Sequence, residues 1–408
     1  MNVRIFPSKA QGEVIAPPSK SIAHRYLICA GLSEGASIVR NLAFSKDIEA
    51  TIRCLSDLGA VIRIDGDTAY VKGVDLRKTV NDTSALFCGE SGSTLRFLIP
   101  LCLLSGEKRT LKGSRYLLSR PLSVYEEIAR QNGFLFEKSD DTLTVAGALQ
   151  SGLYTVRGDI SSQFISGLLF ALPLLDGDSE IVITPPLESM PYIDLTVDAL
   201  HFFGVDVDFD YHPERKAYVC EIKGNQRYLP QDVTVEGDCS NAAFFHALNF
   251  AGGQVRVTGL DPHTMQGDGV FYQLFQKIGN KGIADLTDCP DLGPVAFAVA
   301  ALLGRGMFTG TERLRLKESD RIAAMQEELH KCGVEMIAAD NAVSIGGVLR
   351  PPKKPLFGHN DHRIVMALSV LLTVTGGTIE GAEAVEKSFP DFFEKLGSLG
   401  VKITYGMD

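Results

Sequence analysis

The chain has 408 residues, of which 45% are hydrophobic and 22% are charged, and its formal net charge at pH 7 is −10. This length suits two or three globular domains, and the negative charge argues against a general nucleic-acid-binding surface, although it leaves room for a local basic cleft. The longest uninterrupted apolar run, residues 295–303, is far shorter than the ~18 residues that a membrane span needs. The first residues lack the apolar core of a signal peptide, so we expect a cytoplasmic protein.

The eight cysteines contain no CxxC pair, and most of them lie in apolar stretches such as RYLICAG and IPLCLLSG. This usage is typical of reduced, structural thiols in a cytosolic protein. The cysteine pattern gives little support to a zinc site, and we expect no metal.

Two series of glycines divide the chain into about six repeated units. In the first series an apolar segment ends at a glycine, and these glycines lie at positions 35, 106, 177, 253, 306 and 377. In the second series an amphipathic helix ends at a glycine before an alternating strand, at positions 59, 133, 204, 279, 333 and 400. Most intervals are 67–76 residues long, whereas the fourth interval of each series is 53 or 54 residues long.

Each unit is predicted to contain a strand, a helix, a strand, a second helix and further strands, which indicates an α/β protein. Glycine at the end of the second helix suits a left-handed C-cap that leads directly into a strand. The helices of the first series have no polar face, so we expect them to be buried inside each lobe.

Charged and hydroxyl residues gather where the predicted apolar helices begin. In PPSKSIAHR, residues 17–25, two prolines precede Ser19 and a helix is predicted to follow, which offers unpaired N–H groups to an anion. Ser21 and Arg25 would share one face of that helix, as would Lys20 and His24. The alternative is a serine-capped helix with solvated cations.

Two further segments of the first half suit anions, although each is a weak signal alone. The turn CGESGSTLRFL, residues 88–98, places glycines where the backbone could approach an anion closely, and Arg120 precedes a proline at a predicted helix start. Ser161, Ser162 and Gln163 open the third apolar helix, where N-capping explains at least one of the serines.

The second half repeats this arrangement. Asp288 and Asp291 directly precede an apolar helix, and EKSFPDFFEKL contains Lys387 before a predicted capping box of Ser388 with Asp391. Other polar residues at predicted helix starts are Lys317, Glu318, Arg321, His362 and Arg363. Each segment alone is a plausible capped helix, but the recurrence at the same end of several repeats indicates one anion-binding site.

The segments PPSKSIAHR, RLKESDRIAAM, DHRIVMA and KSFPDFFEKL, in this order, are similar to motifs of the 5-enolpyruvylshikimate-3-phosphate synthase family, the 3-phosphoshikimate 1-carboxyvinyltransferases. The resemblance covers nearly the full chain, because the glycine turn, the SSQ segment and DCSNAAFF also fall where that family has theirs. It implies the two-lobed enolpyruvyl-transferase fold, an inside-out α/β barrel of six βαβαββ repeats with three in each lobe. We place one lobe at residues 18–228 and the other at residues 1–17 with 229–408, and the active site in the cleft between them.

The family activity is transfer of the enolpyruvyl group of phosphoenolpyruvate to the 5-hydroxyl of shikimate 3-phosphate, with release of phosphate. The reaction passes through a tetrahedral intermediate and belongs to the shikimate pathway, which leads to chorismate and the aromatic amino acids and is the target of glyphosate. The resemblance implies no metal and no organic cofactor. We expect small-molecule substrates as the only partners, with neither nucleic acid nor membrane, and a monomeric enzyme.

The family motifs also imply roles for individual residues of this sequence. Shikimate 3-phosphate is expected to contact Lys20, Ser21, Arg25, Ser161, Ser162, Gln163, Ser189, Asp291 and Lys317. Phosphoenolpyruvate is expected to contact Lys20, Gly92, Arg120, Gln163, Arg321, Arg363 and Lys387. Asp291 is the expected base for the hydroxyl, Glu318 and Lys20 serve the methylene carbon, and His362 lies in the site without an assigned role.

The sequence shows a departure from the family pattern and leaves two alternative functions to consider. Glu90 stands where the family has asparagine, so we expect its carboxylate to turn aside and pair with Arg96 or Arg120. The related transferase that acts on UDP-N-acetylglucosamine uses a loop cysteine, and no cysteine occurs here between Gly113 and Arg120. A non-catalytic anion-binding protein is the other rival, and Asp291 and Glu318 beside the cations argue against it.

Overall fold

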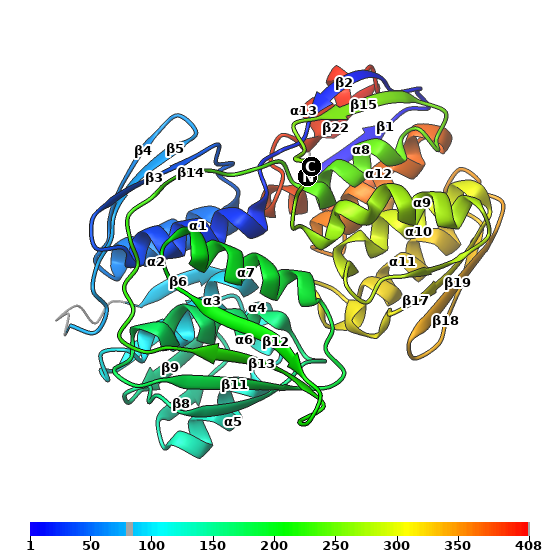
Figure 1. Cartoon of the computed structure of the whole chain (residues 1–408). Helices are drawn as coiled ribbons and strands as arrows, with labels where there is room; N and C mark the ends of the chain where they lie inside the picture. The colour runs from blue at the N-terminus through cyan, green and yellow to red at the C-terminus, as the bar shows by residue number, and fades with distance from the viewer. Residues whose placement is uncertain (79–84, 407–408) are drawn as a thin grey trace. The chain divides into compact units, whose positions relative to one another are not determined.

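The computed structural model describes residues 1–78 and 85–406. The chain divides into two compact units, one formed by Pro18–Val235 and the other by Met1–Pro17 with Glu236–Asp408 (Figure 1). We call them the continuous unit and the discontinuous unit. Residues 229–235 lie in the continuous unit, whereas the sequence placed the boundary at residue 228. The reason is that β14 (Asp232–Thr234) pairs in parallel with β3 (Ala36–Arg40).

Among its described residues the continuous unit contains three four-stranded sheets that share one topology. Each sheet consists of a parallel pair extended by an antiparallel hairpin, in the orders β14-β3-β5-β4, β6-β7-β9-β8 and β10-β11-β13-β12. The remaining strands are β4 (Val61–Asp65), β5 (Thr68–Lys72), β6 (Leu86–Gly89), β7 (Arg109–Gly113), β8 (Leu135–Lys138), β9 (Thr142–Ala146), β10 (Leu153–Arg157), β11 (Ser179–Thr184), β12 (Val207–His212) and β13 (Ala217–Ile222).

In the residues that the structure describes, the continuous unit contains three α-helices that are buried along most of their length and four that are only partly buried. The apolar helices α1 (Lys20–Leu32), α3 (Gly92–Cys102) and α6 (Ser162–Ala171) are buried along nearly their whole length, which confirms the prediction. The other helices are α2 (Lys46–Asp57), α4 (Arg115–Ser119), α5 (Ser123–Asn132) and α7 (Met190–Phe202). Helices α3 and α6 pack together in the core, because apolar side chains on every face can be buried only between other elements.

The discontinuous unit contains, in its described residues, the sheets β16-β17-β19-β18 and β20-β21-β1-β22 and the pair β15-β2. The two-stranded sheet β15-β2 explains why the fourth interval between the repeated glycines is short. With this sheet the predicted set of six repeats is complete. The strands are β1 (Asn2–Ile5), β2 (Gln11–Ile15), β15 (Gln254–Thr258), β16 (Ile283–Asp285), β17 (Arg305–Thr309), β18 (Val334–Ala338), β19 (Ala342–Gly347), β20 (Leu356–Phe357), β21 (Gly377–Glu380) and β22 (Ile403–Gly406). Both termini lie in this unit, where β1 pairs with β22 (Figure 1).

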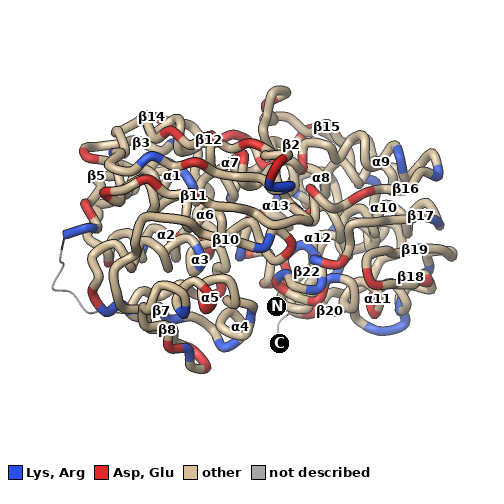
Figure 2. Tube along the Cα trace, turned by 60° about the horizontal axis from the view of Figure 1, so that its bottom comes forward, with Lys and Arg blue, Asp and Glu red and all other residues tan. Residues whose placement is uncertain are grey.

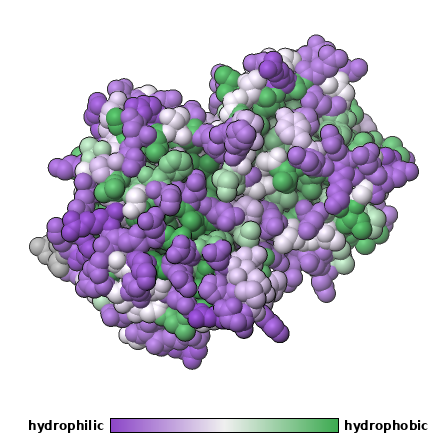
Figure 3. Space-filling view, in the orientation of Figure 1, coloured by the Kyte–Doolittle hydropathy of each residue, from purple (hydrophilic) through white to green (hydrophobic). Residues whose placement is uncertain are grey.

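The helices of the discontinuous unit follow the same division. The apolar members α8 (Cys239–Ala247), α10 (Gly293–Leu303) and α12 (His362–Thr375) are largely buried, as predicted. The others are α9 (Phe271–Gly279), α11 (Arg321–Lys331) and α13 (Phe392–Ser398). Hydrophilic residues cover most of the face shown in Figure 3, which agrees with apolar helices that lie inside.

The predicted left-handed helix ends are confirmed at five of the six glycines. Their φ angles are 110° at Gly59, 74° at Gly133, 75° at Gly204, 76° at Gly333 and 85° at Gly400. The prediction is wrong at position 279, where the glycine is the last residue of α9. There the N–H of residue 282 closes the helix end on the carbonyl of residue 277, and residue 281 takes the left-handed conformation with φ 62°.

All eight cysteines lie in the described part of the chain, where each is buried with a free thiol. This confirms the prediction of structural thiols. Within residues 1–78 and 85–406, no helix combines the length and apolar character needed to cross a membrane.

Candidate functional site

In the discontinuous unit, a group of charged residues surrounds Asp291, and Figure 2 shows residues of both signs around α12. Asp291 lies in a 3₁₀ turn, Pro290–Leu292, that leads into α10. Its Oδ1 accepts a hydrogen bond from Nη1 of Arg321 at 2.9 Å, and its Oδ2 accepts one from Nη2 of Arg363 at 2.8 Å. Nζ of Lys317 lies 3.6 Å from Oδ1. One carboxylate therefore faces three cations.

The neighbouring cations determine whether the carboxyl group of Asp291 is protonated. Burial acts to raise the pKa of its carboxyl, but Arg363, Lys317 and Arg321 outweigh burial and hold the pKa well below its usual range. Burial lowers the pKa of Lys317 from 10.5 to about 8, with Asp291 acting in the opposite direction. At neutral pH Asp291 is thus ionised, and Lys317 is close enough to its pKa to lose its proton in mild alkali.

Asp361 holds this cluster in place, and sequence reasoning missed it. Its Oδ1 caps α12 by accepting the N–H of Arg363 at 2.9 Å, and its Oδ2 accepts Nε of Arg321 at 2.9 Å. Both Asp361 and Arg321 are almost completely buried. In the sequence Asp361 resembles any N-cap aspartate, so no local signal distinguishes its second function.

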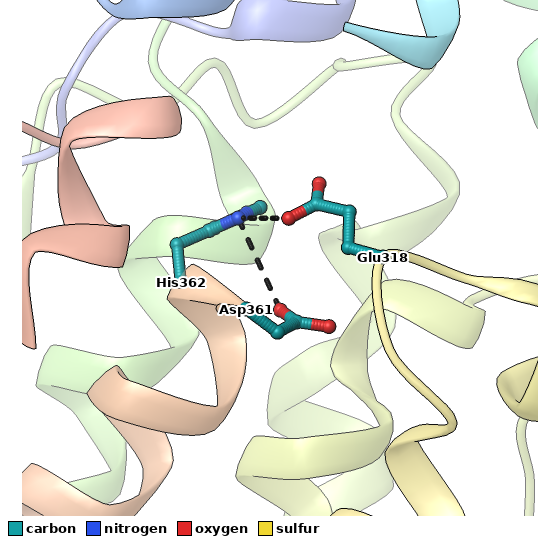
Figure 4. A group of neighbouring side chains, drawn as sticks. All are labelled: Glu318, Asp361 and His362. Atoms are coloured by element: carbon teal, nitrogen blue, oxygen red, sulfur yellow. Dashed lines mark hydrogen bonds and ion pairs between the residues drawn. The ribbon is translucent and has the colours of Figure 1, made fainter. Parts of the chain in front are cut away.

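His362 and Glu318 form a pair at the start of α12 (Figure 4). Nδ1 of His362 lies 2.8 Å from Oε2 of Glu318 and 4.0 Å from Oδ1 of Asp361. Ligand atoms of these three residues lie within 4.8 Å of one another, which by geometry could hold a metal ion. Arg321 and Ser319 already donate hydrogen bonds to Oδ2 of Asp361, so side chains of the protein bind this carboxylate. The expectation that the protein uses no metal stays a prediction.

Lys387 ends a 3₁₀ helix, Ala382–Lys387, and its Nζ donates to the carbonyl of Asn360 at 2.6 Å. This contact connects it to the segment that precedes α12. The predicted capping box is wrong, because the N–H of Ser388 closes the preceding turn on Val385 and α13 begins only at Phe392.

In the continuous unit, Arg25 connects the start of α1 to the start of α7. Its Nη1 donates to the carbonyl of Ser21 and its Nη2 to the carbonyl of Tyr192, both at 2.7 Å, and Nε donates to Oγ1 of Thr196 at 2.9 Å. Burial lowers the pKa of Arg25 to about 10, so the guanidinium remains charged at neutral pH. Ser189 is buried at the N-cap position of α7, in a left-handed conformation with φ 57°.

Lys20 is the first residue of α1 and forms an ion pair with Asp47 in the first turn of α2, with Nζ 2.8 Å from Oδ2. Sequence reasoning missed Asp47 as well, since it resembles an ordinary acidic residue in a first helical turn.

A buried series of hydrogen bonds joins α1 to the start of α3. Nδ1 of His24 lies 2.8 Å from Oγ1 of Thr51, whose hydroxyl lies 2.7 Å from that of Thr94. Thr94 donates to Oγ of Ser91, the N-cap of α3, at 2.7 Å. Burial, with Lys20 and Arg25 nearby, lowers the pKa of His24 well below its usual value, so the ring is neutral. This series of hydrogen bonds fixes the starts of α1 and α3 relative to each other.

The starts of α3 and α6 meet through Gln163. Its Oε1 accepts Nη1 of Arg96 at 2.7 Å, and its Nε2 donates to Oγ of Ser93 at 3.0 Å. Ser161 caps α6 by accepting the N–H of Gln163, as the capping interpretation predicted, and Ser162 is the first residue of the helix.

Gly92 and Arg120 lie against each other at the start of α3. A Cβ added at Gly92 would lie 2.6 Å from Nη1 of Arg120, so only glycine fits with the guanidinium in this place. Arg120 itself lies between α4 and α5, and the predicted helix begins three residues later, at Ser123. Glu90 lies between β6 and Ser91 and is partly exposed, and its pairing with Arg96 or Arg120 stays a prediction.

The structure thus gathers the expected site residues into groups within each unit. In the discontinuous unit Asp291 contacts Lys317, Arg321 and Arg363 directly, while Glu318 and His362 join them through Asp361. The continuous unit offers the starts of α1, α3, α6 and α7, which bear the residues Lys20, Ser21, Arg25, Gly92, Ser161, Ser162, Gln163 and Ser189.

Comparison with known proteins identifies related chains. The family model described as EPSP synthase (3-phosphoshikimate 1-carboxyvinyltransferase) matches residues 6–287 and 280–396. A 3-phosphoshikimate 1-carboxyvinyltransferase of Clostridium kluyveri is 42% identical over 428 aligned positions, with 98% of each chain covered, and one of Clostridium novyi is 39% identical over 431 positions, also with 98% of each covered.

Two solved structures share the fold. An EPSP synthase from Acinetobacter baumannii superposes with a TM-score of 0.77 at 24% identity and covers 99% of this chain and 100% of its own. The enolpyruvyl transferase NikO from Streptomyces tendae superposes with a TM-score of 0.74 at 16% identity, with 99% and 98% covered.

Proposed function

Because the chain belongs to the EPSP synthase (3-phosphoshikimate 1-carboxyvinyltransferase) family, we propose that it transfers the enolpyruvyl group of phosphoenolpyruvate to the 5-hydroxyl of shikimate 3-phosphate. The observation that supports this chemistry best is the buried carboxylate of Asp291 among Lys317, Arg321 and Arg363. A carboxylate among these cations can accept the proton of an acceptor hydroxyl, a step that the transfer needs and that anion binding alone does not.

The substrates explain the number of cations. Each phosphate carries about −1.5 to −2 charges at neutral pH, so the two phosphates and two carboxylates bring about −5 to −6 charges together. We propose that shikimate 3-phosphate contacts Lys20, Ser21, Arg25, Ser161, Ser162, Gln163, Ser189, Asp291 and Lys317. Phosphoenolpyruvate in turn contacts Lys20, Gly92, Arg120, Gln163, Arg321, Arg363 and Lys387. These residues come from both units.

The proposed reaction moves two protons. Asp291 accepts the proton of the 5-hydroxyl as the hydroxyl oxygen bonds to C2 of the enolpyruvyl group, and C3 takes a proton from Glu318 or Lys20. In the resulting tetrahedral intermediate C3 then returns a proton, and the C2–O bond to phosphate breaks. His362 holds the Glu318 carboxylate at 2.8 Å, which orients it for this exchange.

Asp291 needs phosphoenolpyruvate in order to act as a base. Without ligand its oxygens accept from Arg321 and Arg363, and its pKa is held well below the usual range. A bound phosphate or carboxylate would draw these guanidinium groups away, because they form strong paired hydrogen bonds to both. That transfer would raise the pKa of Asp291 and free its oxygens for the hydroxyl.

We further propose that the enzyme acts as a monomer in the cytoplasm, on small-molecule substrates and without metal or organic cofactor. The eight buried, free thiols suit a reducing compartment.

A phosphate-release assay tests the activity. We expect release from phosphoenolpyruvate with shikimate 3-phosphate as acceptor and none with UDP-N-acetylglucosamine, in keeping with the lack of a cysteine between Gly113 and Arg120. Asp291→Asn is the matched control, because it removes the base in a nearly unchanged shape and should lower kcat at least ~100-fold. Release with the second acceptor alone would identify the rival transferase, and ligand binding with no release would identify a non-catalytic protein.

A further inference from the structure

Glu328 is a fully buried carboxylate that the proposed reaction does not use. It lies on α11 with 0% of its surface exposed. Its Oε1 accepts from Nζ of Lys331 and faces Nε2 of His359, both at 2.8 Å, and its Oε2 accepts the N–H of Phe357 and Nζ of Lys331, both at 3.0 Å. Burial acts to raise its pKa, but the hydrogen bonds from His359, Lys331 and Phe357 outweigh burial and lower it. The carboxylate is therefore ionised and fully used as an acceptor.

Helix α11 holds the segment 357–361 at two points. Arg321 and Glu328 are seven residues apart, which is about two helical turns, so they share one face of α11. Arg321 donates to Asp361 at one end of the segment, while Glu328 contacts Phe357 and His359 at the other. The segment therefore lies along one face of the helix and is fixed at both of its ends.

The shape of this segment sets the place of the proposed phosphoenolpyruvate-binding cations. His359 and Asn360 both have left-handed backbones, with φ 49° and 51°, a conformation that residues other than glycine seldom adopt, so the contacts of the segment help to hold it. The carbonyl of Asn360 accepts Nζ of Lys387 at 2.6 Å. Asp361, the next residue, binds Arg321 through its side chain and caps the helix that bears Arg363.

We propose that Glu328 is a positioning residue for phosphoenolpyruvate binding: by holding Phe357 and His359 it keeps the strained segment in the shape that presents Lys387, Arg321 and Arg363. This inference rests on the proposed function for the identity of the ligand. Lys331 lies between Glu328 and the exposed Glu327, where its ammonium supplies the positive charge that these carboxylates require.

The test compares Glu328→Gln with Glu327→Gln. Glu327 is the adjacent residue, its side chain is 59% exposed, and it also binds Lys331, at 3.1 Å, so the control removes the same charge and a contact to the same lysine. In the described structure the N–H of Phe357 and the ring of His359 meet Glu328 rather than Glu327. We expect Glu328→Gln to raise the KM for phosphoenolpyruvate about tenfold, with the KM for shikimate 3-phosphate changed less than about twofold. Glu327→Gln should leave both constants within about twofold of the wild type.

An unchanged KM for phosphoenolpyruvate in folded Glu328→Gln would overturn the proposal, and so would an equal rise in both constants. Circular dichroism and thermal melting establish whether the variant is folded. If it is not, His359→Asn decides, since asparagine tolerates the left-handed backbone but lacks the imidazole that faces Glu328: a selective rise in the KM for phosphoenolpyruvate supports the proposal, and no change overturns it. If the wild type releases no phosphate, the proposed function fails, and calorimetric affinities of the same variants for phosphoenolpyruvate judge the positioning role by themselves.

Discussion

Raising the pH should weaken the binding of shikimate 3-phosphate through one residue, Lys317. Its pKa is lowered from 10.5 to about 8, first by burial and then by Arg313, Arg321 and Arg363, with Asp291 opposing them. The other cations near it are arginines, which stay charged in this range. Lys317 is therefore the group of this cluster whose charge changes just above neutral pH.

The magnitude follows from the fraction of Lys317 that carries a proton. At about pH 7 roughly nine tenths of the side chain is charged, and at about pH 9 roughly one tenth is charged. The apparent Kd is the intrinsic Kd divided by the competent fraction, so affinity should fall about tenfold over this range. The phosphate of the ligand has its second pKa near ~6 and stays fully ionised throughout.

Calorimetry with shikimate 3-phosphate alone measures this effect, because omitting phosphoenolpyruvate leaves the cluster in its ligand-free state. Titrations at several pH values give Kd, and buffers of different ionisation enthalpy give the number of protons taken up. At about pH 9 the complex should take up close to one proton, since the bound phosphate restores the charge of Lys317. The same shift should make the free energy of unfolding rise between about pH 8 and 10.5, because the unfolded chain then holds a proton that the folded chain has lost.

Lys317→Arg is the control, since a guanidinium keeps its charge over the whole range. Whatever the affinity of this variant at neutral pH, its Kd should not depend on pH between about 7 and 9. A wild-type Kd that is constant within about twofold over this range would refute the reasoning, as would an arginine variant with the wild-type pH dependence.

Three further substitutions test the continuous unit. Arg25→Ala removes the contacts to Ser21, Tyr192 and Thr196 and should weaken shikimate 3-phosphate by about 2–5 kcal/mol, measured as Kd by calorimetry; a near-normal Kd would exclude Arg25 from the site. Gly92→Ala should raise the KM for phosphoenolpyruvate, because its Cβ would lie 2.6 Å from the Arg120 guanidinium, and an unchanged KM would show that the arginine is not needed there. Glu90→Asn should leave kcat within a few fold and the KM for phosphoenolpyruvate equal or lower; a large loss of activity would mean that the carboxylate has a function of its own.

The sequence predicts well what composition and short-range pattern determine. The helix around Ala298 is apolar on every face and must be buried, and Gly133 ends a helix because a left-handed backbone suits it. The wrong predictions lie where a hydrogen bond to a neighbouring residue determines where a helix begins or ends. At Gly279 the helix end is closed by the residues beyond it, and at Ser388 the hydroxyl residue completes the turn before it rather than capping the helix after it.

Contacts between distant segments could not be predicted in this way. Asp47 and Asp361 look like ordinary acidic residues at helix starts, yet they bind Lys20 and Arg321. Neither ion pair produces a periodic pattern in the sequence, because the partners are 27 and 40 residues apart and belong to different helices. The family motifs supply the cations together with Asp291, whereas Asp47 and Asp361 become visible as their partners only in three dimensions.

These carboxylates explain how an acidic chain can keep buried cations ready for anionic substrates. An unpaired buried charge is costly, so the ligand-free protein must supply anions of its own. Asp291 does so for Arg321 and Arg363, and substrate binding then exchanges one anionic partner for another. Affinity would thus reflect the difference between two paired states, while the displaced carboxylate becomes the base that the reaction needs. It follows that Asp291→Asn should lower kcat strongly but should not weaken phosphoenolpyruvate, because the amide competes less well than the carboxylate for the two arginines; a large loss of phosphoenolpyruvate affinity in this variant, measured by calorimetry, would contradict the exchange.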